Sequence, residues 1–281
     1  MNKSLKKNLE YYLKASQDWK KYSCVSRNYP PSFSHQLRRN HGGIKPPELC
    51  LELIQAYGEK SNNIIDPFVG AGSSLIAASI LGKKAIGIEI NPLWYELYKK
   101  VCSNDNIPPQ KYLIGDSESI LKKFKTNFFD FVITDVPYFN MDKLPQTRGK
   151  FSKAGEPTKE KLPSSLKRFN EIRFPSKEMW LKKLENIFKE LIPITKDNTI
   201  FLIFIGNMYR NIETSNNSNK KIGKYLNLDL DLANILEKIG LIWIKELIWS
   251  DPGKKLGIYG YPYSFIPSLL DQRILVFSKY S

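Results

Sequence analysis

Cysteine and histidine are scarce in this sequence of 281 residues, which contains three cysteines and two histidines. Cys24, Cys50 and Cys102 lie far apart and lack the spacing of metal ligands, so the sequence predicts neither a disulfide framework nor a zinc site. We therefore expect three reduced, mostly structural thiols and no bound metal.

Long hydrophobic runs are also missing. No apolar stretch reaches the length needed to span a membrane, and the first residues, MNKSLKKNLEYYLK, lack the apolar core of a secretory signal. These absences predict a cytoplasmic protein without a membrane partner.

Acidic residues are too few to balance the basic ones. The chain has 28 Asp and Glu against 43 Lys and Arg, a formal net charge of +15. Such a charge attracts polyanions and favours nucleic acid as the partner. The alternative at this stage is a solvated, lysine-rich surface without a specific partner.

The length and the 42% hydrophobic content fit one large core better than two independent domains. Residues 1–40 read as a basic N-terminal arm, which either contacts phosphate groups or is a solvated segment that precedes the domain. Residues 41–281 read as the folded domain that carries the main site. Within it, residues 139–176 are rich in proline, glycine and basic residues and indicate an inserted loop.

Short apolar strands alternate with helices from residue 45 onward. This alternation predicts an α/β fold with a mostly parallel sheet covered on both faces, in which ligands bind beyond the carboxyl ends of the strands. Helices are expected near 46–57, 72–81, 93–102, 177–191 and 228–239. Strands are expected near 64–65, 85–90, 112–115, 129–134, 199–206, 241–249 and 273–279.

A glycine-rich turn, DPFVGAGSS at 66–74, follows the first of these strands and leads into a helix. Glycines let the backbone approach a ligand closely, and the free amides at a helix start favour a carboxylate or phosphate. The turn resembles the first signature of the amino-DNA methyltransferases, the family that methylates adenine N6 or cytosine N4. This resemblance implies a Rossmann-like methyltransferase fold with a mostly parallel, seven-stranded sheet, and S-adenosylmethionine as cofactor.

The resemblance extends to the residues that would hold the cofactor. Glu89, at the end of the strand 85–90, is similar to the family's acidic residue whose oxygens accept from the ribose hydroxyls. Asp116 corresponds to an acidic side chain near the adenine amino group, and Lys45 lies in a Lys-Pro segment similar to one that holds the methionine end. The predicted cofactor-binding residues are Lys45, Asp66, Phe68, Gly70, Gly72, Ser73, Glu89, Asn91 and Asp116.

The segment TDVPYF at 134–139 follows the strand FDFVI and resembles the family's catalytic motif, [DNS]-P-P-[YFW]. A conjugated exocyclic amine is a poor nucleophile, and hydrogen-bond acceptors on its hydrogens make its nitrogen more reactive. The aromatic residue would stack on a base extruded from the duplex. Predicted catalytic residues are Asp135, Val136, Pro137 and Tyr138, with Val136 in place of the family's first proline. Neither His35 nor His41 follows this strand, so no histidine base is expected.

Two basic loops are candidates for contacts with nucleic acid. Arg148, Lys150 and Lys153 lie in the 139–176 stretch, and Lys254 and Lys255 lie in a tyrosine-rich segment at 249–265. The alternatives are a solvated insertion for the first loop and simple packing for the second.

The sequence predicts a site-specific methyltransferase acting on double-stranded DNA. Asp135 favours adenine over cytosine as the target, because serine is typical of cytosine enzymes in the family. A restriction endonuclease is a candidate partner. Two alternatives stay open: an RNA guanine-N2 methyltransferase with a similar motif, and a catalytically silent nucleic-acid-binding subunit.

Overall fold

The computed structural model describes residues 3–38, 41, 44–137, 139, 174–212, 222–253 and 271–280. The helices in this part of the chain are α1 (Lys3–Lys21), α2 (His35–Arg38), α3 (Pro47–Tyr57), α4 (Ser73–Ile80), α5 (Pro92–Asn104), α6 (Ser117–Leu121), α7 (Lys177–Ile194) and α8 (Leu228–Lys238). The strands are β1 (Cys24–Ser26), β2 (Asn63–Asp66), β3 (Lys84–Glu89), β4 (Lys111–Ile114), β5 (Phe129–Asp135), β6 (Thr195–Ile205), β7 (Met208–Ile212), β8 (Ile222–Leu226), β9 (Leu241–Ser250) and β10 (Asp271–Lys279).

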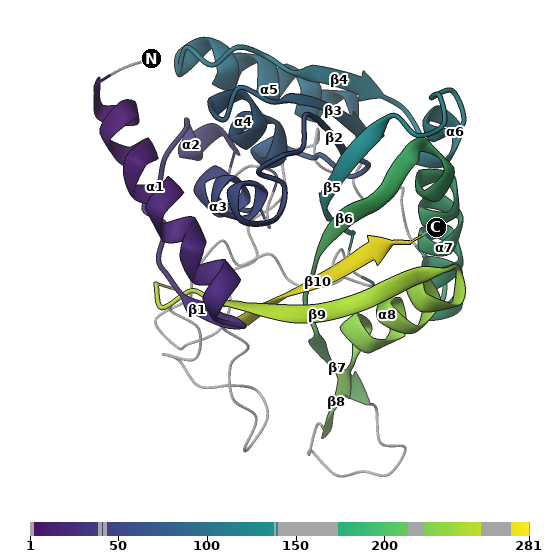
Figure 1. Ribbon diagram of the computed structural model, residues 1–281. Coiled ribbons are helices and arrows are strands. Elements are labelled where there is room, and N and C mark those ends of the chain that lie inside the picture. Colours follow the sequence, from purple (N-terminus) through teal and green to yellow (C-terminus); the bar gives the residue numbers. More distant parts are fainter. Residues whose placement is uncertain are drawn as a thin grey trace.

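One large sheet organises the molecule, with strands in the order β1-β9-β10-β6-β5-β2-β3-β4 (Figure 1). Strands β2 to β6 pair in parallel, β1 pairs in parallel with β9, and β10 runs antiparallel to both of its neighbours. The predicted α/β class and mostly parallel sheet are therefore confirmed. The order reverses between β2 and β5, and ligands bind outside such a point in open α/β sheets.

The two faces of the sheet carry separate hydrophobic cores. On β2, Ile64 points into the core under α1, α3, α4 and α5, whereas the next residue, Ile65, points into the core under α7 and α8. This alternation follows from the two-residue period of a strand. The helices on both faces expected from the sequence are confirmed.

The helices and strands expected after residue 45 are all present, with modest shifts at their ends. The sheet has eight strands, so the seven predicted were one too few. The additional strand is β1, which pairs Cys24, Val25 and Ser26 with the end of β9. Three residues are too short to show an alternating pattern, and only the neighbouring strand defines them as a strand.

Helix α1 packs against α3 through a buried polar network. The carboxylate of Glu52 on α3 accepts hydrogen bonds from Trp19 Nε1 at 2.8 Å and from the Tyr29 hydroxyl at 2.9 Å. It also forms an ion pair with Arg27. This network ties α1 and the segment around β1 to the helix that precedes the glycine turn.

Candidate active site

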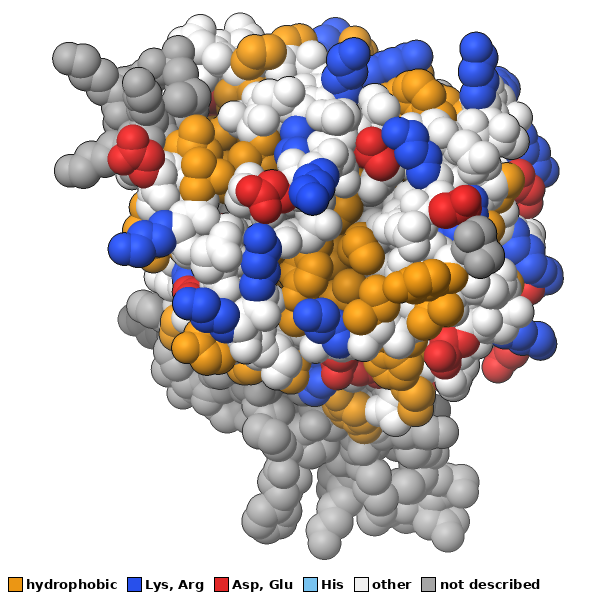
Figure 2. Space-filling view, viewed as in Figure 1, with side chains coloured by type: hydrophobic (Ala, Val, Ile, Leu, Met, Phe, Trp, Pro, Cys, Tyr) orange, Lys and Arg blue, Asp and Glu red, His pale blue; other side chains and the backbone are white. Residues whose placement is uncertain are grey.

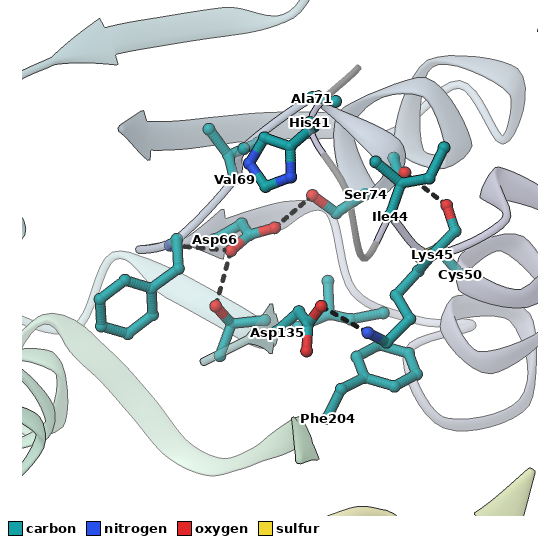
Figure 3. Close-up of a pocket in the computed structure, with 15 residues that line it drawn as sticks. His41, Ile44, Lys45, Cys50, Asp66, Val69, Ala71, Ser74, Asp135 and Phe204 are labelled. Carbon is teal, nitrogen blue, oxygen red and sulfur yellow. Dashed lines mark hydrogen bonds and ion pairs between the residues drawn. The ribbon is translucent and has the colours of Figure 1, made fainter. Parts of the chain in front are cut away.

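A pocket lies at the carboxyl ends of β2, β5 and β6 (Figure 3). It brings together the segment before α3, the glycine turn and the end of the catalytic strand. Its lining residues are His41, Ile44, Lys45, Cys50, Asp66, Phe68, Val69, Gly70, Ala71, Ser73, Ser74, Ile133, Thr134, Asp135 and Phe204.

The glycine turn requires residues without a side chain. Gly70 and Gly72 have φ values of +48° and +83°, which L-residues with a side chain rarely adopt. A Cβ atom on Gly70 would lie 2.7 Å from Nε2 of His41, and one on Gly72 would lie 2.3 Å from Cδ2 of Tyr98. The turn therefore packs directly under the His41 ring and starts α4 beside the pocket.

Asp66 fixes the shape of this turn from the end of β2. Its Oδ1 accepts from the Phe68 amide at 3.0 Å and from the Thr134 hydroxyl at 2.7 Å, and its Oδ2 accepts from the Ser74 hydroxyl at 2.5 Å. Burial raises the pKa of Asp66 to about 6, although these three donors oppose the shift. Thr134 immediately precedes Asp135, so Asp66 links the cofactor turn to the catalytic strand (Figure 3).

Lys45 crosses the pocket to reach Asp135. Its Nζ lies 2.5 Å from Oδ2 of Asp135 and 5.5 Å from the centre of the Phe204 ring (Figure 3). The Lys45 side chain is only 6% exposed, whereas that of Asp135 is 27% exposed. The ion pair therefore joins the Lys-Pro segment to the predicted catalytic residue, a connection that the sequence motifs alone did not reveal.

A buried arginine holds the backbone of Lys45 in place. Arg38 donates to the Lys45 carbonyl at 3.3 Å and to the Ser73 hydroxyl at 3.1 Å, and this hydroxyl donates to the same carbonyl at 2.6 Å. Arg38 also donates to the carbonyls of Ser32 and Phe33. We call the arrangement of Arg38, Ser73 and the Lys45 carbonyl the Arg38 clamp.

Glu89 and Asn91 lie beside the turn, at the end of β3. Glu89 accepts from the Gly70 amide at 3.2 Å and from the Asn91 amide at 2.9 Å. Burial raises the pKa of Glu89 to about 7. Asn91 caps α5 through its side-chain oxygen, and its buried Nδ2 has no hydrogen-bond partner within the described residues.

These features fit a nucleoside with a charged amino-acid tail. Each carboxylate oxygen of Glu89 can accept a second hydrogen bond, as a ribose diol requires, and Asn91 Nδ2 offers a spare donor. The amides at the start of α4 favour a carboxylate.

The backbone after Asp135 is held on both sides. The amide of Val136 donates to the Phe204 carbonyl on β6 at 3.3 Å, a bond that a proline at this position would lack. The carbonyl of Pro137 accepts from Trp180 Nε1 on α7 at 2.6 Å. Val136 therefore gives the loop a hydrogen bond in place of the rigidity of a proline ring.

The structure brings six of the predicted site residues into the pocket lining: Lys45, Asp66, Phe68, Gly70, Ser73 and Asp135. Gly72, Glu89 and Asn91 lie in the adjoining turn and strand end. Asp116 caps α6 and forms an ion pair with Lys183 on α7 at 2.9 Å, outside this lining. The predictions for Tyr138, Arg148, Lys150, Lys153, Lys254 and Lys255 concern residues outside the described part of the chain.

Phe204, Ser74 and Arg38 take part in the site, although the sequence motifs predicted no role for them. Phe204 belongs to a strand recognised only by its hydrophobicity, and pairing with Asp135 across β5 and β6 brings it to the pocket. Arg38 lies in the segment interpreted as a basic arm, yet it is 1% exposed. His41 packs against Trp94 with ring centres 4.5 Å apart, and burial lowers its pKa to about 4. It is therefore neutral near pH 7.

Within the described residues, no group of three or more His, Cys, Asp or Glu side chains has an arrangement that could hold a metal ion. The three cysteines are free thiols. No described helix is long and apolar enough to cross a membrane.

Comparison with solved structures supports the fold. The crystal structure of TrmN from Thermus thermophilus matches with a TM-score of 0.52 and 11% sequence identity, covering 87% of this chain and 52% of that one. In this chain, the glycine turn lines the pocket and is hydrogen-bonded to Glu89 at the acidic end of β3. Together they define the class: a Rossmann-like fold of the S-adenosylmethionine-dependent methyltransferases.

Sequence comparison matches part of the chain to a family. The family model described as DNA methylase, for N6 and N4 methyltransferases, matches residues 2–100. A Type II methyltransferase of Lactococcus lactis subsp. cremoris, M2.LlaDCHI, is 30% identical over 102 residues, which cover 35% of this chain and 38% of that protein. Residues 2–100 are therefore similar to the amino-DNA methyltransferases, and the family match and the fold together support S-adenosylmethionine as the cofactor.

Proteins named for a different activity are also similar. The tRNA (guanine(10)-N2)-dimethyltransferase of Pyrococcus abyssi is 29% identical over 131 residues, which cover 47% of this chain and 39% of that protein. The matches span well under two thirds of the length of either relative.

Proposed function

We propose that this protein transfers a methyl group from S-adenosylmethionine to an exocyclic amino nitrogen of a base flipped out of double-stranded DNA. The observation that carries the proposal is the position of Asp135. Its partly exposed carboxylate ends β5 in the same pocket as the glycine turn, and Asp66 and Lys45 connect it to the cofactor side.

Asp135 acts as an acceptor for the target amine. A carboxylate offers about four acceptor positions, so the contact with Lys45 does not saturate it. Hydrogen bonds from the amine to Asp135 and to the Val136 carbonyl favour a nitrogen lone pair that can attack. We assign the second role to Val136 because the Pro137 carbonyl is already used by Trp180.

S-adenosylmethionine supplies an electrophilic methyl group. The new bond forms between the amine nitrogen and the methyl carbon while the bond from that carbon to sulfur breaks. The nitrogen becomes cationic and loses a proton to solvent. Glu89 and Asn91 would hold the nucleoside end, and Lys45 and the start of α4 the carboxylate end. We also retain Asp116 as a candidate for the adenine end.

The Val136 hydrogen bond argues against a catalytically silent subunit. In a subunit that had lost its activity, this loop would not need a fixed backbone. Here hydrogen bonds hold the loop backbone to both β6 and α7. Adenine N6 is favoured as the target because Asp135 occupies the first catalytic position. The Type II relatives make a cognate restriction endonuclease a reasonable partner.

Methylation of a guanine amino group in RNA is the second candidate, because of the similarity to the tRNA enzyme of Pyrococcus abyssi. The fold, the cofactor pocket and the acceptor role of Asp135 would be the same. Substrate labelling separates the two.

The test uses purified protein with tritiated S-adenosylmethionine and either unmethylated genomic DNA or total RNA, followed by digestion to nucleosides. We expect label in N6-methyladenosine from DNA. An Asp135→Ala variant, with its cofactor binding verified by calorimetry, should give almost none. Label in N4-methylcytidine would make cytosine the target base instead of adenine. Label only in RNA would select the second candidate. No label despite cofactor binding would overturn the proposed activity.

A further inference from the structure

Lys45 differs from the lysines of the molecular surface. Figure 2 shows Lys and Arg side chains scattered over one face of the molecule, where they lie among acidic side chains and face solvent. The Lys45 side chain is only 6% exposed and lines the pocket. Taking an ammonium group out of water is costly unless its partners compensate for the lost hydration. The groups around Lys45 therefore have to explain its position.

The backbone of Lys45 lies beside the start of α4. Its carbonyl accepts from the Ser73 hydroxyl at 2.6 Å and from Arg38 at 3.3 Å, and Ser73 is the first residue of α4. In the proposed function, the amides of this helix start receive the carboxylate of S-adenosylmethionine. The Lys45 side chain therefore begins next to the position assigned to the cofactor tail.

The other end of the same side chain lies at Asp135. Nζ of Lys45 is 2.5 Å from Oδ2 of Asp135 and 5.5 Å from the centre of the Phe204 ring. In Figure 3 the side chain runs from the segment before α3 toward these two residues. A lysine carries three N–H donors on a flexible stem, so one ammonium group can bind two carboxylates at once.

The ion pair restricts the Asp135 side chain. Asp135 ends β5 with 27% of its side chain exposed, and its carboxylate could otherwise turn about its side-chain torsions. The Arg38 clamp fixes the backbone of Lys45, so the pair holds Asp135 relative to α4 as well as to its own strand. Such positioning matters for rate, because a displacement of about 1 Å at a reacting group can cost about 10²-fold.

We propose that Lys45 is a positioning residue for methyl transfer, which binds the carboxylate of S-adenosylmethionine and the carboxylate of Asp135 at the same time. This inference rests on the proposed function and gives the lysine a second role in it. One ammonium group between the two carboxylates sets the methyl donor and the acceptor of the target amine relative to each other. Lys45 acts on the reaction through Asp135 and does not itself exchange a proton with the substrate.

The first test measures the contact with the cofactor tail by calorimetry on the full chain. The probes are S-adenosylhomocysteine and its decarboxylated form, which keeps the amino group but lacks the carboxylate. Lys45→Met should bind S-adenosylhomocysteine about tenfold more weakly, because a charge-assisted hydrogen bond is lost. Its affinity for the decarboxylated probe should change by less than about threefold. Lys45→Arg keeps the charge and should bind S-adenosylhomocysteine within about threefold of the wild type.

The second test measures the action through Asp135, as kcat at saturating cofactor on the substrate found by tritium labelling. Lys45→Met should lower kcat about tenfold, whereas KM for the nucleic acid should stay within about threefold. Asp135→Asn keeps an acceptor oxygen but has no charge to pair with Lys45. In the Asp135→Asn background, Lys45→Met should lower kcat by less than about twofold, because no ion pair is left to break. It should still weaken the binding of S-adenosylhomocysteine.

Lys279→Met provides the matched control. The Lys279 side chain is 14% exposed, and its Nζ lies 3.4 Å from Oδ1 of Asp197, near the beginning of β6. This end of β6 is opposite to the end that borders the pocket. The control therefore also breaks an ion pair of a largely buried lysine, but it should keep the wild-type affinity for both probes and the wild-type kcat.

Each possible result has its own meaning. Equal losses of affinity for the two probes in Lys45→Met would overturn the contact with the cofactor carboxylate. A full tenfold loss of kcat in the Asp135→Asn background would overturn the role through Asp135, and similar losses in Lys279→Met would attribute both effects to reduced stability.

Failure of the proposed function would be seen separately. Methyl transfer to RNA alone would overturn DNA as the substrate, and the same kcat comparison on RNA would still decide the role of Lys45. No transfer by the wild type would overturn the proposed function together with the role through Asp135, and the calorimetry would still decide the contact with the cofactor.

Discussion

Two buried polar networks border α3, and they differ in what surrounds them. On one side, Glu52 is completely buried among Trp19, Tyr29 and Arg27, all of which belong to the protein. On the other, Asp135 ends β5 with 27% of its side chain exposed, in the wall of a pocket.

The difference distinguishes a carboxylate with a structural role from the one for which we propose a catalytic role. Burial beside an arginine does not by itself mark a site, because Glu52 accepts hydrogen bonds from Trp19 and Tyr29, pairs with Arg27 and does not line the pocket of Figure 3. Asp135 also has a cationic partner, but it faces a pocket into which a substrate amine can enter. Substitutions should therefore affect activity at one network and stability at the other.

Asp135→Ala should produce the largest effect on activity. Removing an acceptor aimed at the reacting amine should lower kcat for DNA methylation by about 10² to 10³. The affinity for S-adenosylmethionine, measured by calorimetry, should stay within about threefold of wild type. A variant that loses cofactor binding and activity in parallel would contradict the assignment of Asp135 to the amine.

Glu52→Ala should produce the largest effect on stability. It removes the buried partner of the Arg27 guanidinium, which keeps the more exposed Asp18 at 2.5 Å as an ion-pair partner, and breaking such a buried pair costs about 3–5 kcal/mol. The free energy of unfolding is measured in urea, and kcat below the transition temperature should be unchanged.

The control for Glu52 is Glu59→Ala, at an exposed carboxylate 3.5 Å from Lys20. Exposed pairs contribute about 1 kcal/mol or less, so this variant should unfold almost like the wild type. Similar unfolding curves for the two variants would remove the distinction between the networks.

Arg38→Met should specifically weaken the binding of S-adenosylmethionine. Without the Arg38 clamp, the Lys45 carbonyl and the start of α4 lose a common donor, and we expect about tenfold lower affinity for S-adenosylmethionine. Ser73→Ala, which removes only the smaller part of the clamp, should have a weaker effect in the same titration. Unchanged affinity in a folded Arg38→Met protein would show that the clamp is dispensable.

Glu89 should give the smallest effect, a pH dependence of cofactor affinity. Its pKa is raised to about 7, so the carboxylate that we propose as the acceptor for the ribose hydroxyls forms as pH rises from about 6 to about 8. Affinity should increase several-fold over this range, and Glu89→Gln should bind weakly with little pH dependence. Because folding raises this pKa from 4.5 to about 7, the stability of the cofactor-free protein should also fall as pH rises from 4.5 to about 7. A pH-independent wild type would contradict the role of Glu89.

The early motifs could be read from the sequence because they are local. The turn from Asp66 to Ser73 combines an apolar strand, glycines at positive φ and a helix start within one short segment. Asp135 could be found for a similar reason, since its strand immediately precedes it. The ion pair between Lys45 and Asp135 could not be inferred because the residues are 90 positions apart.

The N-terminal segment illustrates the opposite case. Its many lysines suggested a basic arm, but α1 also carries Trp19, which is buried and bonded to Glu52. The strand β1 exists only because the end of β9 lies beside it. The sequence pattern also gave no sign of β7 and β8, which form a two-stranded sheet apart from the large one.

The sequence by itself determined the alternation of strands and helices, the glycine turn and the carboxylates at the strand ends, because short-range periodicity and backbone requirements specify these features. Only the tertiary structure decided which distant groups meet: Lys45 with Asp135, Arg38 with Ser73, and Trp19 with Glu52. Parallel strands place their carboxyl ends at one edge of the sheet, and packing across that edge selects the partners of each side chain.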